Sequence, residues 1–201
     1  MISTQDRSGW FGASDTKYIM AKSWETKTFR NWWMSKLGIN TSHFTSVAMN
    51  AGTYYEHAIL DVIGSPRKDH QIIIPKFKLR VNLDGDGVGR IDEVKTYNYE
   101  KGFKVKKEYW EQVQVQMFAK LWEEGKTPET KIWAYGLLPE DYTNFFNPID
   151  RERLKDYPIE IEHKFISRYL NRTLYLAECL EKGVMPNEKE YSMRISMRAN
   201  T

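Results

Sequence analysis

The spacing of apolar residues changes in the middle of this chain, and this change constrains the fold more than any other feature. Phe77, Leu79, Val81 and Leu83 alternate with polar residues, which is the pattern of a strand with one buried face. Longer segments on both sides instead show the spacing of amphipathic helices. The sequence therefore predicts an α/β or α+β protein in which a small mixed sheet is flanked by helices.

The predicted elements follow one another as helices, a β-meander, a helix, a strand and a last helix. Helices are expected over 14–21, 29–37, 44–63, 106–124 and 165–181, and strands over 70–74, 77–83, 88–96 and 131–138. Gly38, Gly64 and Gly125 stand where three of these helices would end, as glycine often does. With 201 residues and no internal repeat, the chain is expected to form a single domain over residues 1–201.

Composition excludes several classes of protein. The 41% of hydrophobic and 14% of aromatic residues argue against intrinsic disorder. No apolar run approaches the roughly 20 residues of a membrane-spanning helix, and a start that contains Asp6 and Arg7 does not resemble a secretory signal. The single cysteine, Cys179, excludes an intrachain disulfide and a cysteine-based zinc site. A cytoplasmic protein with no membrane partner is expected, and its net charge of +3 does not exclude nucleic acid.

Residues 82–95 read Asn-Leu-Asp-Gly-Asp-Gly-Val-Gly-Arg-Ile-Asp-Glu-Val-Lys and carry the most informative chemistry. A hairpin turn at the Asp-Gly-Asp-Gly run would end one strand at Asp84 and fold it back beside Glu93, which shares a strand face with Lys95. Two carboxylates and the Val94 carbonyl would form an all-oxygen site suited to Mg²⁺ or Mn²⁺. Lys95 could orient or deprotonate a water, or stabilise charge on a phosphate. Taken alone, this spacing is also common in a solvated hairpin.

A row of polar side chains follows one face of the predicted helix 106–124. Tyr109, Gln112, Gln116 and Lys120 have helical spacing, and Gln114 is offset from them. Buried amides require hydrogen-bond partners. The row would therefore bind a scaffold, a water or a nucleic-acid backbone, and a solvated polar face is the competing interpretation.

Further candidates lie outside these two segments. Glu56, on the predicted helix 44–63, could reach the same metals, although a surface glutamate is the simpler interpretation. Arg7 precedes Ser14 at a predicted helix start, where free amides and a hydroxyl can bind phosphate; Ser14 as an ordinary N-cap is the alternative. Lys104 and Lys106 belong to a basic cluster that could contact phosphates or form a solvated loop.

Taken in order, these pieces resemble the phage lambda exonuclease family, also called YqaJ-like viral recombinases, in the PD-(D/E)XK nuclease superfamily. The matching pieces are Arg7 with Gly-Ala-Ser-Asp at 12–15, Gly-Thr-Tyr-Tyr-Glu at 52–56, Asp84-Gly85 followed by Glu93-Val94-Lys95, and Tyr-Trp-Glu-Gln-Val-Gln-Val-Gln-Met at 109–117. The resemblance covers nearly the whole chain. It departs from the family at 82–83, where a proline is usual, and at 136–138, which read Gly-Leu-Leu instead of containing a Tyr-Asp pair.

The resemblance implies a restriction-endonuclease-like core and Mg²⁺-dependent digestion of one strand of linear duplex DNA from its 5′ end. The 3′ single strand left behind would serve a phage annealing protein in recombination. The implied roles are metal ligation by Asp84, Glu93 and the Val94 carbonyl, a second metal held with Glu56, catalysis by Lys95, support by Gln112 (or Gln114), and a 5′-phosphate site at Arg7 and Ser14. Gln114, Gln116, Lys104 and Lys106 are candidate DNA contacts. A ring-shaped trimer, encoded by a phage or prophage and acting in the host cytoplasm, is also implied.

Two other functions remain open. One is another nuclease of the same superfamily, such as a Cas4-like or RecB-like enzyme, and the other is a DNA-end-binding module without catalysis. The former enzymes often carry cysteines for an iron–sulfur cluster, whereas this chain has one cysteine. A module without catalysis would be expected to lose Lys95 or Glu93, and both are present.

Overall fold

The computed structural model describes residues 8–39 and 47–199. The helices are α1 (Thr16–Ile19), α2 (Lys27–Lys36), α3 (Val47–Val62), α4 (Lys107–Glu124), α5 (His163–Glu181) and α6 (Glu188–Ala199). The strands are β1 (Arg67–Ile74), β2 (Leu79–Gly87), β3 (Arg90–Asn98), β4 (Glu129–Leu137) and β5 (Leu154–Pro158). Short 3₁₀ turns connect several of these elements. None of the described helices is both long and apolar enough to cross a membrane.

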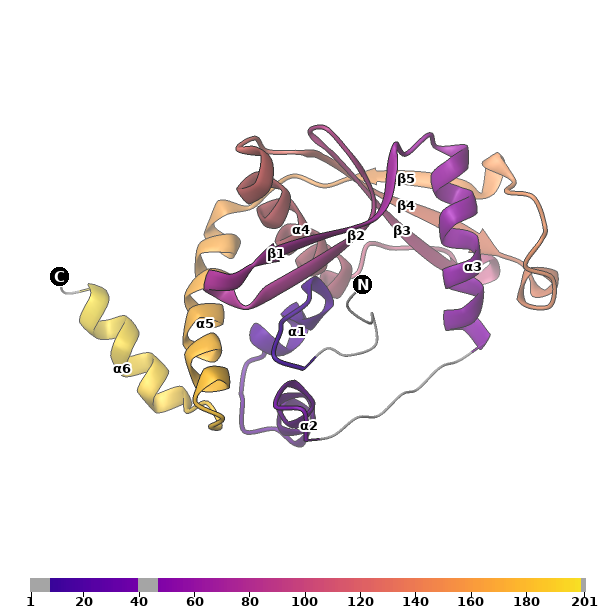
Figure 1. The fold of residues 1–201 in the computed structure, drawn as a ribbon. Coiled ribbons are helices and arrows are strands. Elements are labelled where there is room, and N and C mark those ends of the chain that lie inside the picture. The colour runs from indigo at the N-terminus through magenta and orange to yellow at the C-terminus, as the bar shows by residue number, and fades with distance from the viewer. Residues whose placement is uncertain (1–7, 40–46, 200–201) are drawn as a thin grey trace.

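The strands form one five-stranded mixed sheet in the order β1-β2-β3-β4-β5. β1, β2 and β3 are an antiparallel meander, and β5 pairs antiparallel with β4 at the other edge. β3 and β4 are parallel and are joined through α4, because parallel neighbours need a long crossover connection. The predicted fold class, a small mixed sheet flanked by helices, is confirmed (Figure 1).

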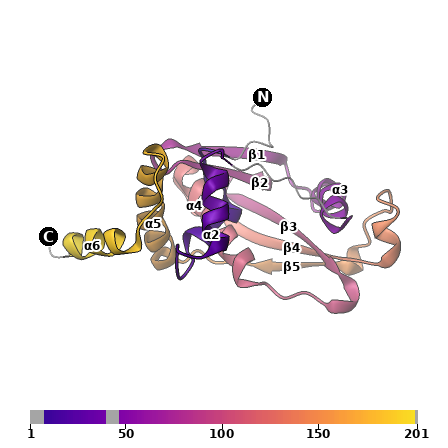
Figure 2. The ribbon, with the colours of Figure 1, turned by 90° about the horizontal axis from the view of Figure 1, so that it is seen from below.

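Apolar residues cover both faces of the sheet. Ile91 and Ile132 belong to the larger cluster, which includes residues of α1, α2, α4 and α5. Val94 and Tyr135 belong to a smaller cluster with residues of α3. Because side chains alternate along a strand, the two clusters lie on opposite faces of β3 and β4. Helix α3 accordingly stands apart from the other helices (Figures 1 and 2).

β2 and β3 pair over a short distance and then separate. Their ladder joins Gly85–Gly87 to Arg90–Asp92 and contains three residue pairs. Beyond it, the side chain of Asp84 takes the place of a backbone partner, since its Oδ2 accepts a hydrogen bond from the Val94 N–H at 2.9 Å. The two strands diverge beyond this ladder in Figure 1.

The hairpin turn lies later than predicted. The turn expected over 84–87 is wrong, because the strand continues to Gly87 and the chain reverses at 88–89. Gly85 is needed for a close approach and not for the turn, since a Cβ there would collide with the side chains of Leu60 and Ser65. Asp84 is therefore held inside a strand and not at a flexible hairpin end.

Two elements were not predicted. The segment 165–181 was expected to be the last helix, but α6 follows it and extends away from the rest of the molecule (Figures 1 and 2). β5 is a short edge strand that ends at Pro158 and alternates only weakly between buried and exposed residues. Neither segment carries the regular apolar spacing from which the other elements were predicted.

Several predicted boundaries also shift. The strand expected from residue 77 begins at Leu79, because Pro75 starts a 3₁₀ turn that ends at Lys78 with a left-handed φ of +51°. The helix expected over 14–21 divides into a 3₁₀ turn, Ala13–Asp15, and the short α1. The first residues of the helix expected over 44–63 lie outside the described part of the chain.

Candidate active site

A pocket of about 670 Å³ opens where β2 and β3 separate. Its walls come from the 3₁₀ turn before α1 and from α2, α3, α4, β1, β2 and β3. The lining residues that carry the chemistry discussed below are Ser14, Glu56, Asp69, Arg80, Asp84, Lys95 and Gln112. Segments far apart in the sequence thus contribute to one concave site, which is the usual form of a ligand pocket.

Asp84 is half-buried in this pocket and carries a charge that the surroundings compensate incompletely. Burial raises the pKa of its carboxyl well above the ordinary value, and the nearby charge of Glu93 raises it further. Lys95 and the Val94 N–H act in the opposite direction without cancelling these effects. The carboxylate form of Asp84 would therefore be stabilised by an additional positive charge.

Glu93 is fully buried and is held by three donors. Its Oε1 accepts hydrogen bonds from the Lys95 ammonium and from Gln112 Nε2, the latter at 2.5 Å. Its Oε2 accepts from Gln116 Nε2 at 2.6 Å. Burial opposes the charge on Lys95, but attraction to Glu93 and Asp84 outweighs it and raises the pKa of the ammonium. These bonds fix the orientation of the Glu93 carboxylate.

Glu56 reaches the same pocket from α3. Burial raises the pKa of its carboxyl, and the charges of Glu93 and Asp69 raise it further. Glu56, His57 and Asp69 offer ligand atoms that lie within 4.8 Å of one another, and His57 Nε2 is 2.9 Å from Asp69 Oδ2. Glu56 therefore shares a pocket with Asp84, and its role as a ligand of the same metals stays a prediction.

Sequence reasoning missed Asp69 and Arg80, which also line the pocket. Position 69 stands opposite Asp84 in the β1–β2 register, between the pairs of residues 68 with 85 and 70 with 83. Asp69 has a left-handed φ of +54°, which is uncommon for a residue other than glycine. Arg80 precedes Asp84 by four residues on β2, so alternation along the strand predicts that both lie on the same face. Asp69 is identified only by the pairing of β1 with β2.

The row of side chains predicted on one face of α4 contacts the β2–β3 hairpin. Gln112 and Gln116 donate to Glu93, and Gln116 Nε2 also donates to the backbone carbonyl of Asn82 at 3.2 Å. Lys120 continues the row one turn later and forms an ion pair with Asp86. The scaffold interpretation of this row is the one that fits, because each member binds the protein itself.

Gln114 and Gln116 do not occupy positions suited to DNA contact. Both side chains are fully buried. The Gln114 amide binds the segment before α5, donating to the Glu160 carbonyl and accepting from the Glu162 N–H, both at 2.7 Å. Burial of both amides disfavours contact with DNA, and the Gln114 amide is directed at the segment before α5 and not at Glu93.

The residues predicted to bind phosphate are only partly assembled. Ser14 is exposed and lines the pocket, but it is not an N-cap, because Asp15 occupies that position before α1. Arg7 lies outside the described residues. Lys106 is exposed and places its ammonium 5.4 Å from the Tyr109 ring centre, while Lys95 lies 5.5 Å from the same ring.

Lys104 is also exposed, at the surface before α4, and it is not among the residues that line the pocket. Lys106, by contrast, shares the Tyr109 ring with Lys95. Neither lysine lines the pocket, and of the two only Lys106 is seen to share a ring with the pocket residue Lys95.

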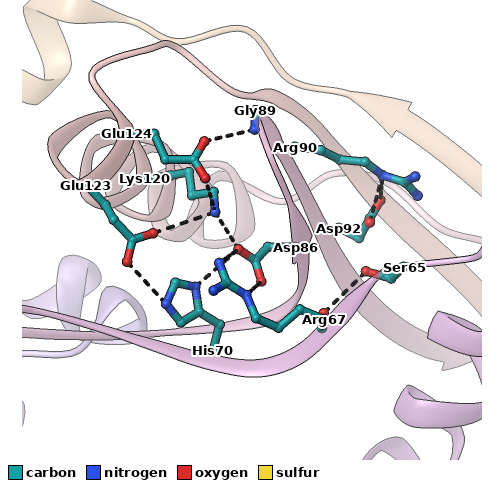
Figure 3. A network of polar contacts seen from close by, with 10 residues as sticks. All are labelled: Ser65, Arg67, His70, Asp86, Gly89, Arg90, Asp92, Lys120, Glu123 and Glu124. Atoms are coloured by element: carbon teal, nitrogen blue, oxygen red, sulfur yellow. Dashed lines mark hydrogen bonds and ion pairs between the residues drawn. The ribbon is translucent and has the colours of Figure 1, made fainter.

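Asp86 lies two residues after Asp84 and has a different environment (Figure 3). Its fully buried carboxylate accepts hydrogen bonds from Arg67 Nε at 2.8 Å and Lys120 Nζ at 2.5 Å, and His70 Nδ1 lies at 3.1 Å. Burial by itself would raise the pKa of Asp86, but the hydrogen bonds from Arg67 and Lys120 outweigh it and lower the pKa. This carboxylate is compensated by protein cations.

The pocket residues fit a hard divalent cation. Asp84, Glu56 and Val94 line the pocket, and Glu93 is buried next to Val94 on β3. Their carboxylates and the Val94 carbonyl offer oxygen only, which is the donor set that Mg²⁺ and Mn²⁺ prefer. Burial and then repulsion from Glu93 raise the pKa of both Asp84 and Glu56, and a divalent cation would offset both effects. Beside this site, Gln116 Oε1 is buried without a hydrogen-bond partner.

Known structures with the same fold are exonucleases. The chain matches the alkaline exonuclease LHK-Exo of Laribacter hongkongensis with a TM-score of 0.62 and 21% identity over 96% of each chain. The structure of LHK-Exo in complex with dAMP matches with a TM-score of 0.62 and 20% identity over 95% of each chain. A phage-related exonuclease from Haemophilus somnus matches with a TM-score of 0.58 and 17% identity, over 94% of this chain and 96% of the other.

Comparisons of sequence are less informative than comparisons of structure. No protein-family model matches the chain, and no curated protein matches it significantly. The structural likeness nevertheless extends over nearly the entire chain and includes the sheet and the helices that form the pocket. This protein therefore has the fold of the alkaline and phage-related exonucleases.

Proposed function

We propose that this protein is a divalent-metal-dependent nuclease that digests one strand of linear duplex DNA from its 5′ end. The observation that carries the proposal is the convergence of Asp84, Glu56 and Lys95 on one pocket, with the buried Glu93 carboxylate paired to Lys95 beside it. The fold shared with exonucleases supports the same reaction class. Digestion would leave a 3′ single strand, which is the substrate of annealing proteins in phage-type recombination.

The acidic groups would hold the metal, with two ions for each site. Asp84, Glu93 and the Val94 carbonyl would bind one Mg²⁺, and Glu56 would contribute to the other; Mn²⁺ would substitute for Mg²⁺. When bound, the ions supply an activated water and neutralise charge on the phosphate. The amides of Gln112 and Gln116 keep the Glu93 carboxylate oriented, as partners of metal ligands commonly do.

Lys95 would act as a cation beside the scissile phosphate. Its raised pKa favours the ammonium form, which can orient a water or stabilise developing negative charge but cannot accept a proton. Of the roles that the sequence allowed, charge stabilisation therefore has more support than general-base catalysis. The Lys95 side chain is 19% exposed and lines the pocket.

The end of the digested strand would bind at the opposite wall of the pocket. Ser14 lies there, and Arg80 and Lys36 also line this region. We propose that Ser14 and Arg7 hold the 5′-phosphate and that Lys104 and Lys106 contact the DNA backbone. Hydroxyl and guanidinium donors suit a phosphate, because both donate charge-assisted hydrogen bonds to its oxygens.

The proposal is tested with end-labelled linear duplexes that carry either a 5′-phosphate or a 5′-hydroxyl, incubated with Mg²⁺ or with EDTA. Wild-type protein should shorten one strand from its 5′ end only with Mg²⁺, and Lys95→Ala should lose this activity. Lys131→Ala is the matched control, because Lys131 forms an exposed ion pair with Asp156 on the far strands. Intact duplexes with wild-type protein and Mg²⁺ would contradict the proposal.

The same experiment separates the alternatives. Internal cleavage would indicate a Cas4-like or RecB-like nuclease, and binding without cleavage would indicate a DNA-end-binding module. Equal rates on both types of end would remove the 5′-phosphate site at Arg7 and Ser14. We also propose one domain over 1–201 and a homotrimer, which sedimentation equilibrium would test against a monomer.

A further inference from the structure

Lys120 is a buried lysine that the proposed reaction does not use. Its side chain is fully buried, and its ammonium lies 2.5 Å from Asp86, 2.7 Å from Glu124 and 3.6 Å from Glu123 (Figure 3). A buried charge is costly unless it is paired and hydrogen-bonded, and the three carboxylates supply that compensation. These residues do not line the pocket.

The carboxylates around Lys120 connect α4 to the first strands of the sheet. His70, on β1, lies between Asp86 of β2 and Glu123 of α4, at 3.1 and 3.2 Å. Glu124 also accepts a hydrogen bond of 2.8 Å from the Gly89 N–H in the β2–β3 turn. The network therefore fastens the C-terminal half of α4 to β1, to β2 and to the hairpin turn.

The same face of α4 reaches the candidate metal ligands. Gln116 lies one turn before Lys120 and donates to Glu93, and Asp86 lies two residues after Asp84. Because the β2–β3 ladder contains three residue pairs, packing of α4 must contribute to the placement of these strands. We propose that Lys120 is a positioning residue, whose ammonium sets the register of α4 against β2 and thereby the placement of Glu93 relative to Asp84.

This inference rests on the proposed function, since it concerns the affinity of the same metal site. Lys120→Met keeps most of the length of the side chain and removes its charge. Asp86, Glu123 and Glu124 would then repel one another without an ammonium between them, and α4 would move away from β2. We expect the affinity for Mn²⁺ to fall about tenfold, as it does when partners of metal ligands are removed.

The experiment is isothermal titration of the full chain with Mn²⁺, with circular dichroism melting to show that each variant is folded. Glu124→Gln is the second variant. It weakens the ion pair between Lys120 and residue 124 and keeps the ion pair between Lys120 and Asp86. Lys131→Met is the charge-matched control. Leu176→Ala, in the buried core of α5, is the control for lost stability without a change in the network.

Reduced Mn²⁺ affinity in Lys120→Met and Glu124→Gln, with normal affinity in the two controls, would support the proposal. Wild-type affinity in folded Glu124→Gln and Lys120→Met would overturn it, as would an equal loss in Leu176→Ala. If Lys120→Met does not fold, Glu124→Gln decides the outcome. Failure of the wild-type protein to bind Mn²⁺ would instead overturn the proposed function, and this inference with it.

Discussion

Asp84 and Asp86 lie two residues apart on β2, and the groups around them differ. Asp86 is fully buried among Arg67, Lys120 and His70, and its pKa is lowered because hydrogen bonds from protein cations outweigh the cost of burial. Asp84 accepts a backbone hydrogen bond and lies near a second carboxylate, and burial and repulsion raise its pKa. Burial alone therefore does not determine whether the pKa of a carboxyl group is raised or lowered.

The difference separates a structural carboxylate from a candidate ligand. A carboxylate whose charge is matched by the protein contributes to the folded state, and removal of one partner leaves an uncompensated charge. A carboxylate whose charge is not matched by the protein costs stability until a cation from solvent binds beside it. Incomplete compensation of this kind is typical of functional sites. Four predictions test this contrast.

The largest expected effect is on DNA digestion. Asp84→Asn should lower the rate roughly 10³-fold, because it removes a charged ligand at the reacting phosphate. Asp86→Asn, assayed at saturating Mg²⁺ below its melting temperature, should retain a rate within about tenfold of wild type, since Asp86 does not line the pocket and affects it only through the packing of α4. Single-turnover digestion of end-labelled duplex measures both rates. Equal losses in the two variants would remove the functional distinction.

In the metal-free protein, Asp86→Asn should lower the stability more than Asp84→Asn does, which is the reverse of their order in DNA digestion. Asp86→Asn breaks a buried ion pair and should lower the free energy of unfolding by about 3–5 kcal/mol. Asp84→Asn removes a repelled charge and should leave the free energy of unfolding unchanged or slightly increased. Urea denaturation at neutral pH in EDTA measures the difference. A stability loss in Asp84→Asn as large as that in Asp86→Asn would refute the assignment of roles.

Metal binding should compensate for the repulsion at Asp84. Mg²⁺ at about 100 times its dissociation constant should stabilise the wild-type protein by about 2.7 kcal/mol, because it binds the folded state. This corresponds to a rise in Tm of several degrees for a chain of this size. Asp84→Asn should show little of this rise, whereas Asp86→Asn should retain about half of it, because a tenfold weaker site at the same Mg²⁺ concentration is stabilised by about 1.4 kcal/mol. Thermal melts with and without Mg²⁺ provide the comparison.

The smallest expected effect is on the pH dependence of stability without metal. The folded pKa of Asp86 lies below its unfolded value, so its contribution is present above the unfolded pKa and is lost as the pH falls through the folded pKa. Asp84 has a raised folded pKa, so its contribution is present below the unfolded pKa and is lost as the pH rises through the folded pKa.

Urea denaturation at about pH 2.5 and about pH 8 compares the proteins on either side of the ordinary carboxyl range. Towards the higher pH, wild type should lose stability relative to Asp84→Asn and gain stability relative to Asp86→Asn. Parallel pH curves for all three proteins would show that neither carboxyl group changes its pKa on folding.

Local spacing was sufficient to predict much of the fold and part of the site. The apolar periods of α4, β2 and β3 place their buried faces, so the row of Gln112, Gln116 and Lys120 could be predicted. The two-residue period also places Glu93 and Lys95 on one side of β3, and they form an ion pair. These features depend on residues close together in the chain, for which backbone geometry determines direction.

The tertiary structure decided what each polar group meets. The position of the hairpin turn, the burial of Gln114 and the recruitment of Asp69 and Arg80 depend on strand register and on contacts with distant segments. Nothing in local spacing distinguishes Asp84 from Asp86, since each precedes a glycine on the same strand. Only the packing of β1 and α4 surrounds Asp86 with cations and leaves Asp84 beside another carboxylate, because electrostatic compensation is a property of neighbours in space.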